Sequence, residues 1–238
     1  MKIEKAVLYA ADINELNMSG MYEKILPRLD DDRRRKISEY GKNLKGAMQS
    51  AGAGLLLEYV LKSHGIFEHD MFFSEKGKPY LAGRRDIFFN LSHSNNMVIC
   101  AVSPVEVGCD IEFVKSGRTR IAQRYFTKEE QCFAQISERH FYRMWTLKES
   151  FIKATGMGLG LRLDSFEISV KEKEISVRQA EDEREFAFRE YPCFSDYCCS
   201  ICIAYENAAK KDAGIVDIPD IAEHIEMVSF ADMLDVIG

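Results

Sequence analysis

The feature of this 238-residue chain that most constrains its fold is the order of its periodic segments. Long helical patterns cover residues 44–64 and 138–155, with a shorter one at 31–40, and each long helix is followed by several short strands. Strands are expected at residues 3–10, 87–91, 97–102, 105–114, 165–171, 174–177, 185–189 and 197–205. Because strands do not alternate one for one with helices, the pattern favours an α+β fold over a doubly wound parallel sheet. The repeated succession predicts a duplicated architecture.

Local signals mark the helix boundaries in the second part of the chain. Thr127 is followed three residues later by Glu130, which is the capping-box pattern. The helix expected at 138–155 stops before Gly156, a residue suited to a left-handed cap. We therefore expect two α+β halves at 1–104 and 105–209. A tail of unassigned role follows at 210–238, which either docks as a helix or stays mobile.

Composition excludes several classes of protein. Asp and Glu number 38 against 32 Lys and Arg, so the formal charge of −6 argues against a general nucleic-acid binder. No apolar run approaches the roughly 20 residues that span a bilayer, and the first apolar stretch (6–11) is too short for a signal sequence. The expectation is a cytoplasmic protein with no membrane contact. Cys199 and Cys202 lie on an expected buried strand and face opposite ways, which disfavours a metal or redox site.

An acidic strand carries the first candidate for chemistry. Asp110 and Glu112 are two residues apart, so their side chains project from the same face, while Cys109 and Ile111 face the other way. Adjacent carboxylates repel each other unless a cation or proton lies between them, and oxygen ligands of this kind suit Mg²⁺. The alternative interpretation is a solvated strand face.

The helix expected at 138–155 carries the second candidate. Glu149 and Lys153 lie on a polar stripe, and at this spacing they also suit an ordinary salt bridge. Lys148 falls in the middle of the apolar arc, where an ammonium needs an anionic partner. A phosphate or a buried acid could supply that partner.

Two polar loops complete the candidates. The segment Phe89-Asn90-Leu91-Ser92-His93-Ser94 ends an expected strand, and His93 with nearby hydroxyl donors suits phosphate oxygens. No G-x-S-x-G motif accompanies Ser92, which disfavours a hydrolase nucleophile. Gly77-Lys78-Pro79 is a turn that carries a lysine. A plain hydrogen-bonded turn is the alternative in both places.

Together these blocks resemble the 4′-phosphopantetheinyl transferases, in the monomeric type that activates surfactin synthetase. The matching blocks, in order, are GKPYL, FNLSHS, VGCDIE, FT-x-E-E and FYRMWTLKESFIKATGMGL, between residues 77 and 159. The resemblance implies a pseudo-twofold pair of α+β halves with coenzyme A in the cleft between them. It also implies a holo-[acyl-carrier-protein] synthase, which transfers phosphopantetheine to a serine of an apo acyl or peptidyl carrier protein and releases 3′,5′-ADP. The carrier would serve fatty-acid, polyketide or non-ribosomal peptide synthesis.

The resemblance also implies roles for particular residues. Asp110, Glu112 and Glu149 would surround Mg²⁺, with Mn²⁺ as an alternative ion. Glu149 would act as the general base and Lys153 would hold the diphosphate. Ser50 would keep a hydroxyl contact at a position where many relatives have Arg-Thr and this chain has Gln49-Ser50. The remaining contacts to coenzyme A would come from Arg33, Lys36, Lys78, Asn90, Ser92, His93, Lys148 and Lys153.

A basic segment is the expected docking site for the carrier protein. No acid lies between Glu112 and Glu129, and the segment Lys115–Lys128 contains five basic residues, namely Lys115, Arg118, Arg120, Arg124 and Lys128. Positive charge would steer an acidic carrier, although a solvated helix face has the same composition. Two other functions compete with the transferase: a metal-dependent phosphodiesterase and a non-catalytic module that binds coenzyme A or a carrier protein.

Overall fold

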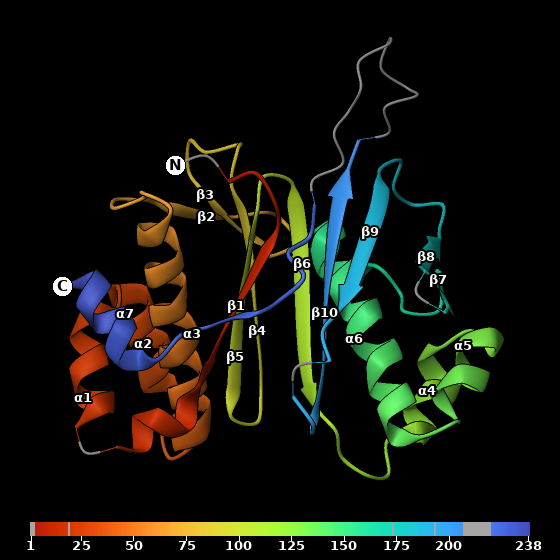
Figure 1. The fold of residues 1–238 in the computed structure, drawn as a ribbon, viewed down its shortest axis with the longest axis horizontal. Helices are drawn as coiled ribbons and strands as arrows, with labels where there is room; N and C mark the ends of the chain where they lie inside the picture. The colour runs from red at the N-terminus through yellow and green to blue at the C-terminus, as the bar shows by residue number, and fades with distance from the viewer. Residues whose placement is uncertain (1–2, 19, 173, 193, 207–219) are drawn as a thin grey trace.

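The structure is a computed structural model, and it describes residues 3–18, 20–172, 174–192, 194–206 and 220–238. Figure 1 shows the arrangement of its elements. The helices are α1 (Met21–Ile25), α2 (Asp31–Glu39), α3 (Leu44–Ser63), α4 (Thr119–Tyr125), α5 (Lys128–Ala134), α6 (Glu138–Thr155) and α7 (Phe230–Ile237). The strands are β1 (Val7–Asp12), β2 (Met71–Phe73), β3 (Pro79–Leu81), β4 (Phe88–Ser94), β5 (Met97–Ser103), β6 (Glu106–Phe113), β7 (Glu167–Lys171), β8 (Glu174–Arg178), β9 (Glu185–Glu190), β10 (Tyr197–Tyr205) and β11 (Glu226–Met227).

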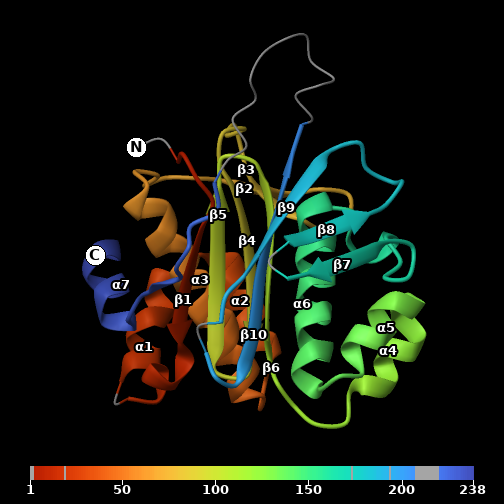
Figure 2. The same cartoon turned by 45° about the vertical axis from the view of Figure 1, so that its right-hand side comes forward.

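Two sheets form the centre of the molecule. One has the strand order β11-β1-β5-β4 and the other has the order β6-β10-β9. Alternate residues face opposite ways, so Leu8 and Ile99 of the first sheet pack with Cys109 and Ile201 of the second in a common core. Figures 1 and 2 place α3 and α6 on opposite sides of this pair of sheets. The layers therefore run helix, sheet, sheet, helix, which is an α+β architecture.

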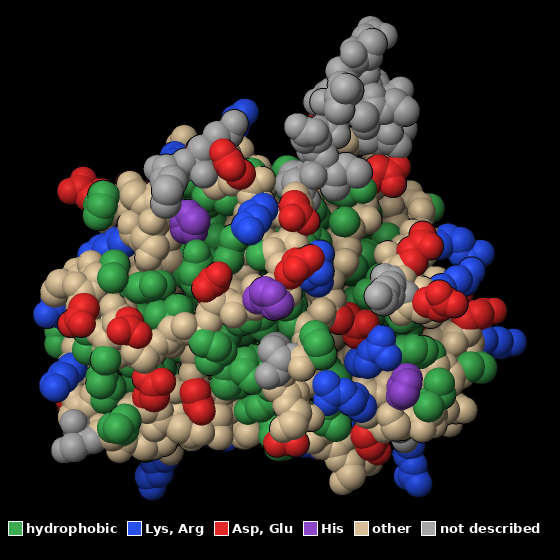
Figure 3. Space-filling view, in the orientation of Figure 1, with side chains coloured by type: hydrophobic (Ala, Val, Ile, Leu, Met, Phe, Trp, Pro, Cys, Tyr) green, Lys and Arg blue, Asp and Glu red, His purple; other side chains and the backbone are tan. Residues whose placement is uncertain are grey.

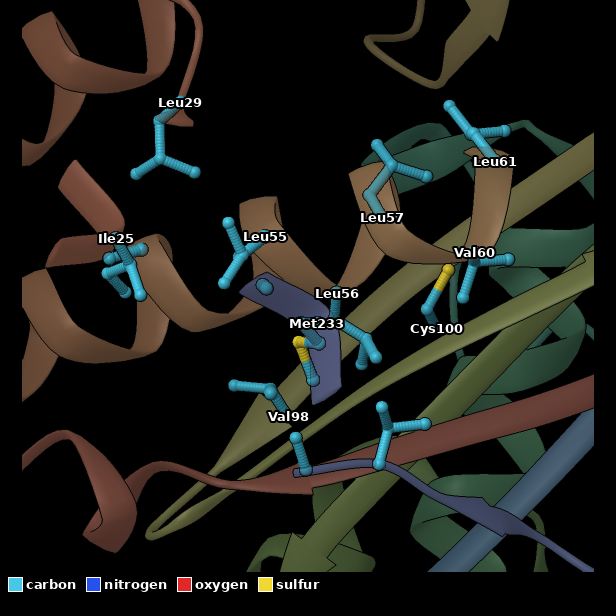
Figure 4. Close-up of a cluster of buried hydrophobic side chains, with 14 of the residues drawn as sticks. Ile25, Leu29, Leu55, Leu56, Leu57, Val60, Leu61, Val98, Cys100 and Met233 are labelled. Carbon is cyan, nitrogen blue, oxygen red and sulfur yellow. The ribbon is translucent and has the colours of Figure 1, made fainter. Parts of the chain in front are cut away.

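The helix α3 covers the outer face of the first sheet. Figure 4 shows Leu56 and Val60 of α3 in one cluster with Val98 and Cys100 of β5. Met233 of α7 is fully buried in the same cluster. This core holds the elements that line the cavity described below.

Residues 220–238 return to the first sheet. β11 pairs in parallel with β1, and Phe230 of α7 is fully buried in the cluster around α3. The Lys62 ammonium of α3 also donates to the carbonyl of Ile237 at 2.9 Å. The described part of the expected tail therefore docks as a strand and a helix, while residues 210–219 lie outside the described residues.

The helix α6 packs on β6 at unusually close range. Gly108 allows this approach, because a Cβ atom there would overlap the backbone of Ser150 and Ala154 in α6. The same strand face carries Asp110 and Glu112, which therefore project toward α6.

Several boundaries expected from the sequence are confirmed. The capping box joins Thr127 and Glu130, and α6 ends at Gly156 in the left-handed conformation. Cys199 faces the core between the sheets, whereas Cys202 faces the core under α6. In the described ranges, no helix combines the length and apolar character needed to cross a membrane. Acidic and basic side chains are interspersed on the face viewed in Figure 3.

Candidate active site

The candidate site lies where β4 of the first sheet runs alongside β6 of the second. Asn90, Ser92 and Ser94 of β4 direct their side chains toward β6, whereas Phe89 and His93 of the same strand line a cavity. Because side chains alternate along a strand, one face of β4 contacts the carboxylate strand β6 and the other face lines the cavity.

Asp110 and Lys153 form the ion pair at the centre of the site. The Lys153 Nζ donates to Asp110 Oδ1 at 2.7 Å, to the carbonyl of Cys109 at 3.0 Å and to Ser92 Oγ at 3.1 Å. Burial acts to lower the pKa of Lys153, but the charges of Asp110, Cys109 and Glu149 and the hydrogen bond to Asp110 together outweigh it, and the pKa is raised. Lys153 is therefore held as a cation beside β6.

Two further carboxylates surround this pair. Burial raises the pKa of Glu149, and the negative charge of Asp110 raises it further. The pKa of Glu112 is raised by the same two causes in the same order, against a hydrogen bond that Ser94 donates to its Oε2 at 2.7 Å. Three acids from β6 and α6 thus share one partly dehydrated region with a single lysine from α6.

This donor set fits a hard divalent cation. Lys153 pairs with Oδ1 of Asp110, whereas Oδ2 of the same carboxylate is buried without a hydrogen-bond partner and is left for a ligand. Oxygen-only ligands of this kind suit Mg²⁺. With the side chains as they stand, no three His, Cys, Asp or Glu groups in the described residues form a closed ligand cluster.

A cavity with a volume of about 1370 Å³ lies on the face of β4 that carries Phe89 and His93. It brings together four residues that the sequence resemblance assigned to coenzyme A, namely Arg33, Lys36, Ser50 and His93, from α2, α3 and β4. Ser50 Oγ is buried without a hydrogen-bond partner. Burial lowers the pKa of His93, and the charges of Lys153 and Lys36 lower it further. The charge of Lys36 in the cavity and that of Lys153 at the carboxylate site therefore both act on His93.

Lys148 lies in the protein interior and not in the cavity. Its Nζ is within 2.5 Å of Glu130 Oε1 and donates to the carbonyl of Phe166 at 2.9 Å, and both charged side chains are fully buried. Burial lowers the pKa of Lys148, while the charge of Glu130 opposes that shift. The structure thus corrects the expected contact of Lys148 with coenzyme A. The sequence left a phosphate or a buried acid as the partner of Lys148, and the structure shows the buried acid.

Lys78 and Asn90 are also occupied by the protein itself. The Lys78 Nζ contacts Glu106 Oε2 at 2.5 Å and donates to the carbonyls of Val107 and Ala154. Asn90 Oδ1 accepts the backbone N–H of Cys109 at 2.9 Å. Asn90 ties β4 to β6, and Lys78 ties the turn before β3 to β6 and α6. Neither side chain lines the cavity as their expected coenzyme A contacts require.

The basic segment Lys115–Lys128 forms an exposed surface next to the carboxylates. Its five basic residues are exposed, whereas Ala122 and Phe126 are buried against α6. Lys115 follows Glu112 by three residues, and its charge opposes the rise in the pKa of Glu112, so the segment starts beside the site. The surface is thus anchored by apolar contacts and presents its charge to solvent.

Sequence reasoning missed the contacts of Ser94 and Glu130. Ser94 follows Ser92 by two residues, so the strand period already indicated that both hydroxyls share a face. Glu130 was assigned only to a helix cap, and its second role requires α6 and β7 to pack against it. The local sequence pattern therefore indicates the contact of Ser94 but not the buried contacts of Glu130.

Comparison with known proteins defines the family. Residues 106–202 match the model of the 4′-phosphopantetheinyl transferase superfamily. A 4′-phosphopantetheinyl transferase of Bacillus subtilis is 27% identical over 237 residues, covering 95% of this chain and 99% of that protein. The transferase Sfp of Bacillus subtilis (strain 168) is 29% identical, covering 89% of this chain and 92% of Sfp.

A third relative has a higher identity over a shorter range. The transferase gsp of Aneurinibacillus migulanus is 31% identical over 173 residues, covering 69% of this chain and 72% of that protein. The chain therefore belongs to the 4′-phosphopantetheinyl transferase superfamily, and its activity is that of a transferase.

Proposed function

We propose that this enzyme transfers the 4′-phosphopantetheine group of coenzyme A to a serine of an apo acyl or peptidyl carrier protein, with Mg²⁺, and releases 3′,5′-ADP. The observation that carries the proposal is that β4 joins two regions: a cavity to which Arg28, Arg33 and Lys36 bring positive charge among several acids, and the carboxylates of β6 and α6. The family supplies the reaction class, and the cavity supplies a site for a phosphorylated ligand.

The 3′-phosphate of coenzyme A binds at the end of the cavity formed by α2 and α3. Arg33 and Lys36 supply positive charge, and the unpartnered hydroxyl of Ser50 supplies a hydrogen bond. His93 lines the cavity and follows Ser92, whose hydroxyl contacts Lys153, so β4 links this end of the cavity to Lys153. A ligand with a phosphate at one end and a diphosphate at the other matches this order of groups.

Asp110, Glu112 and Glu149 would hold Mg²⁺. The ion would neutralise charge on the diphosphate and so favour departure of the 3′,5′-ADP group. The unpartnered Asp110 Oδ2 and the crowding of three acids support these ligands.

Glu149 accepts the proton of the carrier serine, directly or through one water. Its pKa is raised by burial and by Asp110, which makes it a stronger base than an exposed glutamate. Lys153 holds the diphosphate, with its raised pKa ensuring that it remains charged. Both residues lie on α6, four positions apart, so one helix positions the base and the cation.

The carrier protein docks on Lys115–Lys128. The exposed charges of this segment lie beside Glu112, so an acidic partner attracted to them arrives next to the carboxylates. The boundary between two halves at residue 104 fits this scheme, because the cavity is lined by the first part of the chain and the carboxylates belong to the second.

Intact-mass analysis tests the proposal. An apo carrier protein is incubated with the enzyme, coenzyme A and Mg²⁺, beside a Glu149→Gln variant, an EDTA sample and a Glu181→Gln control from an exposed loop. We expect the carrier to gain one phosphopantetheine with the wild-type enzyme and the control, and not with Glu149→Gln or EDTA. Hydrolysis of coenzyme A without a gain in carrier mass would contradict transfer and favour a phosphodiesterase.

A further inference from the structure

The strands β4 and β6 belong to different sheets but lie side by side, and side chains of β4 take the place of a backbone ladder. Asn90 Oδ1 accepts the N–H of Cys109 at 2.9 Å, and Ser94 Oγ accepts the N–H of Phe113 at 3.1 Å. These amides lie on the edge of β6 opposite β10, where they need acceptors. The carboxylates of β6 are therefore held at a junction between sheets.

Ser94 makes two contacts of different kind with β6. Its oxygen accepts the N–H of Phe113, and its hydroxyl donates to Glu112 Oε2 at 2.7 Å. A serine has a single proton to donate, and the incoming N–H occupies one of its lone-pair directions. The hydroxyl proton is consequently directed at the carboxylate, and Glu112 is tied to the backbone of its own strand through Ser94.

Holding Glu112 in one position needs such a contact. The side chain has three rotatable bonds and lies on the same strand face as Asp110, whose negative charge repels it. The hydrogen bond to Oε2 restrains the position of that oxygen and leaves Oε1 for another partner. Oriented ligands of this type bind a metal more tightly than mobile ones, because less freedom is lost on binding.

We propose that Ser94 is a positioning residue, which orients Glu112 for the divalent cation; this inference rests on the metal site of the proposed function. Ser94 differs in this from Ser92, whose oxygen contacts both Asp110 and Lys153. A change at Ser92 would disturb the ion pair at the centre of the site. A change at Ser94 acts on Glu112 and on one backbone amide.

The test compares Mn²⁺ binding by four proteins in the presence of coenzyme A and without a carrier, measured from the signal of free Mn²⁺ in electron paramagnetic resonance. The variants are Ser94→Ala, Ser94→Thr, which keeps the hydroxyl, and Ser103→Ala as the control. Ser103 is fully buried on β5 and likewise accepts a backbone N–H, that of Val105. Its loss removes a comparable structural hydrogen bond away from the carboxylates.

We expect Ser94→Ala to raise the Kd for Mn²⁺ by about 10-fold, as seen when an outer-shell partner of a ligand is removed. Ser94→Thr and Ser103→Ala should retain wild-type affinity. In the transfer assay, Ser94→Ala should need more Mg²⁺ for half-maximal rate and approach the wild-type rate at saturating Mg²⁺. Thermal melting should separate this effect from a loss of fold, since Ser103→Ala loses a similar bond.

Each outcome is decisive. Equal Mn²⁺ affinity of the wild-type protein and Ser94→Ala would overturn the role of Ser94 and leave the metal site intact. A loss of affinity that Ser94→Thr does not rescue, or that Ser103→Ala shares, would show a structural effect only and would also overturn it. If the wild-type protein binds no Mn²⁺, the proposed metal site fails, and the role of Ser94 fails with it.

Discussion

Replacing Gly108 by alanine should displace α6 from β6 and separate the two parts of the candidate site. The added Cβ would overlap the backbone atoms Ser150 O and Ala154 N, and it would lie 2.8 Å from the carbonyl carbon of Lys153. These are main-chain atoms of a packed helix, so no side chain can rotate to make room. The helix has to move outward by about 1 Å to restore normal contact distances.

The cost of that movement follows from the packing. Overpacking a well-packed interior costs typically about 1–3 kcal/mol, and contact with main-chain atoms places Gly108→Ala at about 3 kcal/mol. For a chain of this size this corresponds to a fall in Tm of roughly 6–12 °C. Since Lys153 and Glu149 move with α6, a displacement of about 1 Å should also reduce the transfer rate by about 100-fold.

The assay pairs differential scanning calorimetry with the carrier-modification rate at a temperature where the variant is folded. Gly160→Ala is the matched control, because a Cβ there meets nothing closer than 3.9 Å, at the ammonium of Lys76. Wild-type Tm and rate for Gly108→Ala would refute the argument that main-chain contact between β6 and α6 sets the site geometry. A lower Tm with an unchanged rate would refute its catalytic part.

Three more predictions concern the free energy of unfolding, measured by urea denaturation. Lys148→Met leaves Glu130 charged and without its ion-pair partner in the interior, and should cost about 3–5 kcal/mol. Adding Glu130→Gln should restore part of this loss, so equal stability of the single and the double variant would contradict the prediction. Phe230→Ala should cost about 3–5 kcal/mol, because this side chain is fully buried against α3, and a cost near zero would mean that α7 is not docked. The hydrogen bond to Glu58 raises the pKa of His69, so their pair stabilises the fold below the pKa of an unfolded histidine and loses that effect as pH rises through the higher folded pKa. The stability of the wild-type protein should therefore fall between about pH 6 and 8 relative to His69→Gln, by on the order of 1 kcal/mol; parallel pH profiles would exclude this contribution.

The sequence predicts those elements whose signals are local. The helix α6 has its cap, apolar arc and terminal glycine within its own residues, and its bounds are confirmed. The strand β10 is apolar along its length, β6 alternates apolar residues with Asp110 and Glu112, and both are likewise confirmed. By contrast, a docked helix was only one of two expectations for the tail that contains α7, and β11 was not predicted, because it exists through its pairing with β1 at the other end of the chain. A two-residue strand has no periodicity of its own.

The contacts of the site likewise divide into those that local sequence patterns predict and those that they do not. The positions of Asp110 and Glu112 on one strand face follow from the period of two, and the structure places both toward α6. The direction of the Lys78 side chain does not follow from its turn, because Glu106 and the end of α6 draw it away from the cavity. The partner of Lys148 depends on how α5 packs against α6, which no segment of the sequence specifies alone.

The parallel pairing of β11 with β1 has a consequence for the order of events during synthesis. On the ribosome, β1 and α3 emerge well before β11 and α7, and the whole second sheet is made in between. Until then, the apolar surface of α3 that later receives Phe230 stays uncovered and β1 keeps an open edge. Usually the N-terminal part of a chain folds first during translation. Here the edge of the first sheet at β1 and the surface of α3 are covered only by the last elements to be made, so the N-terminal part of the chain completes its packing last.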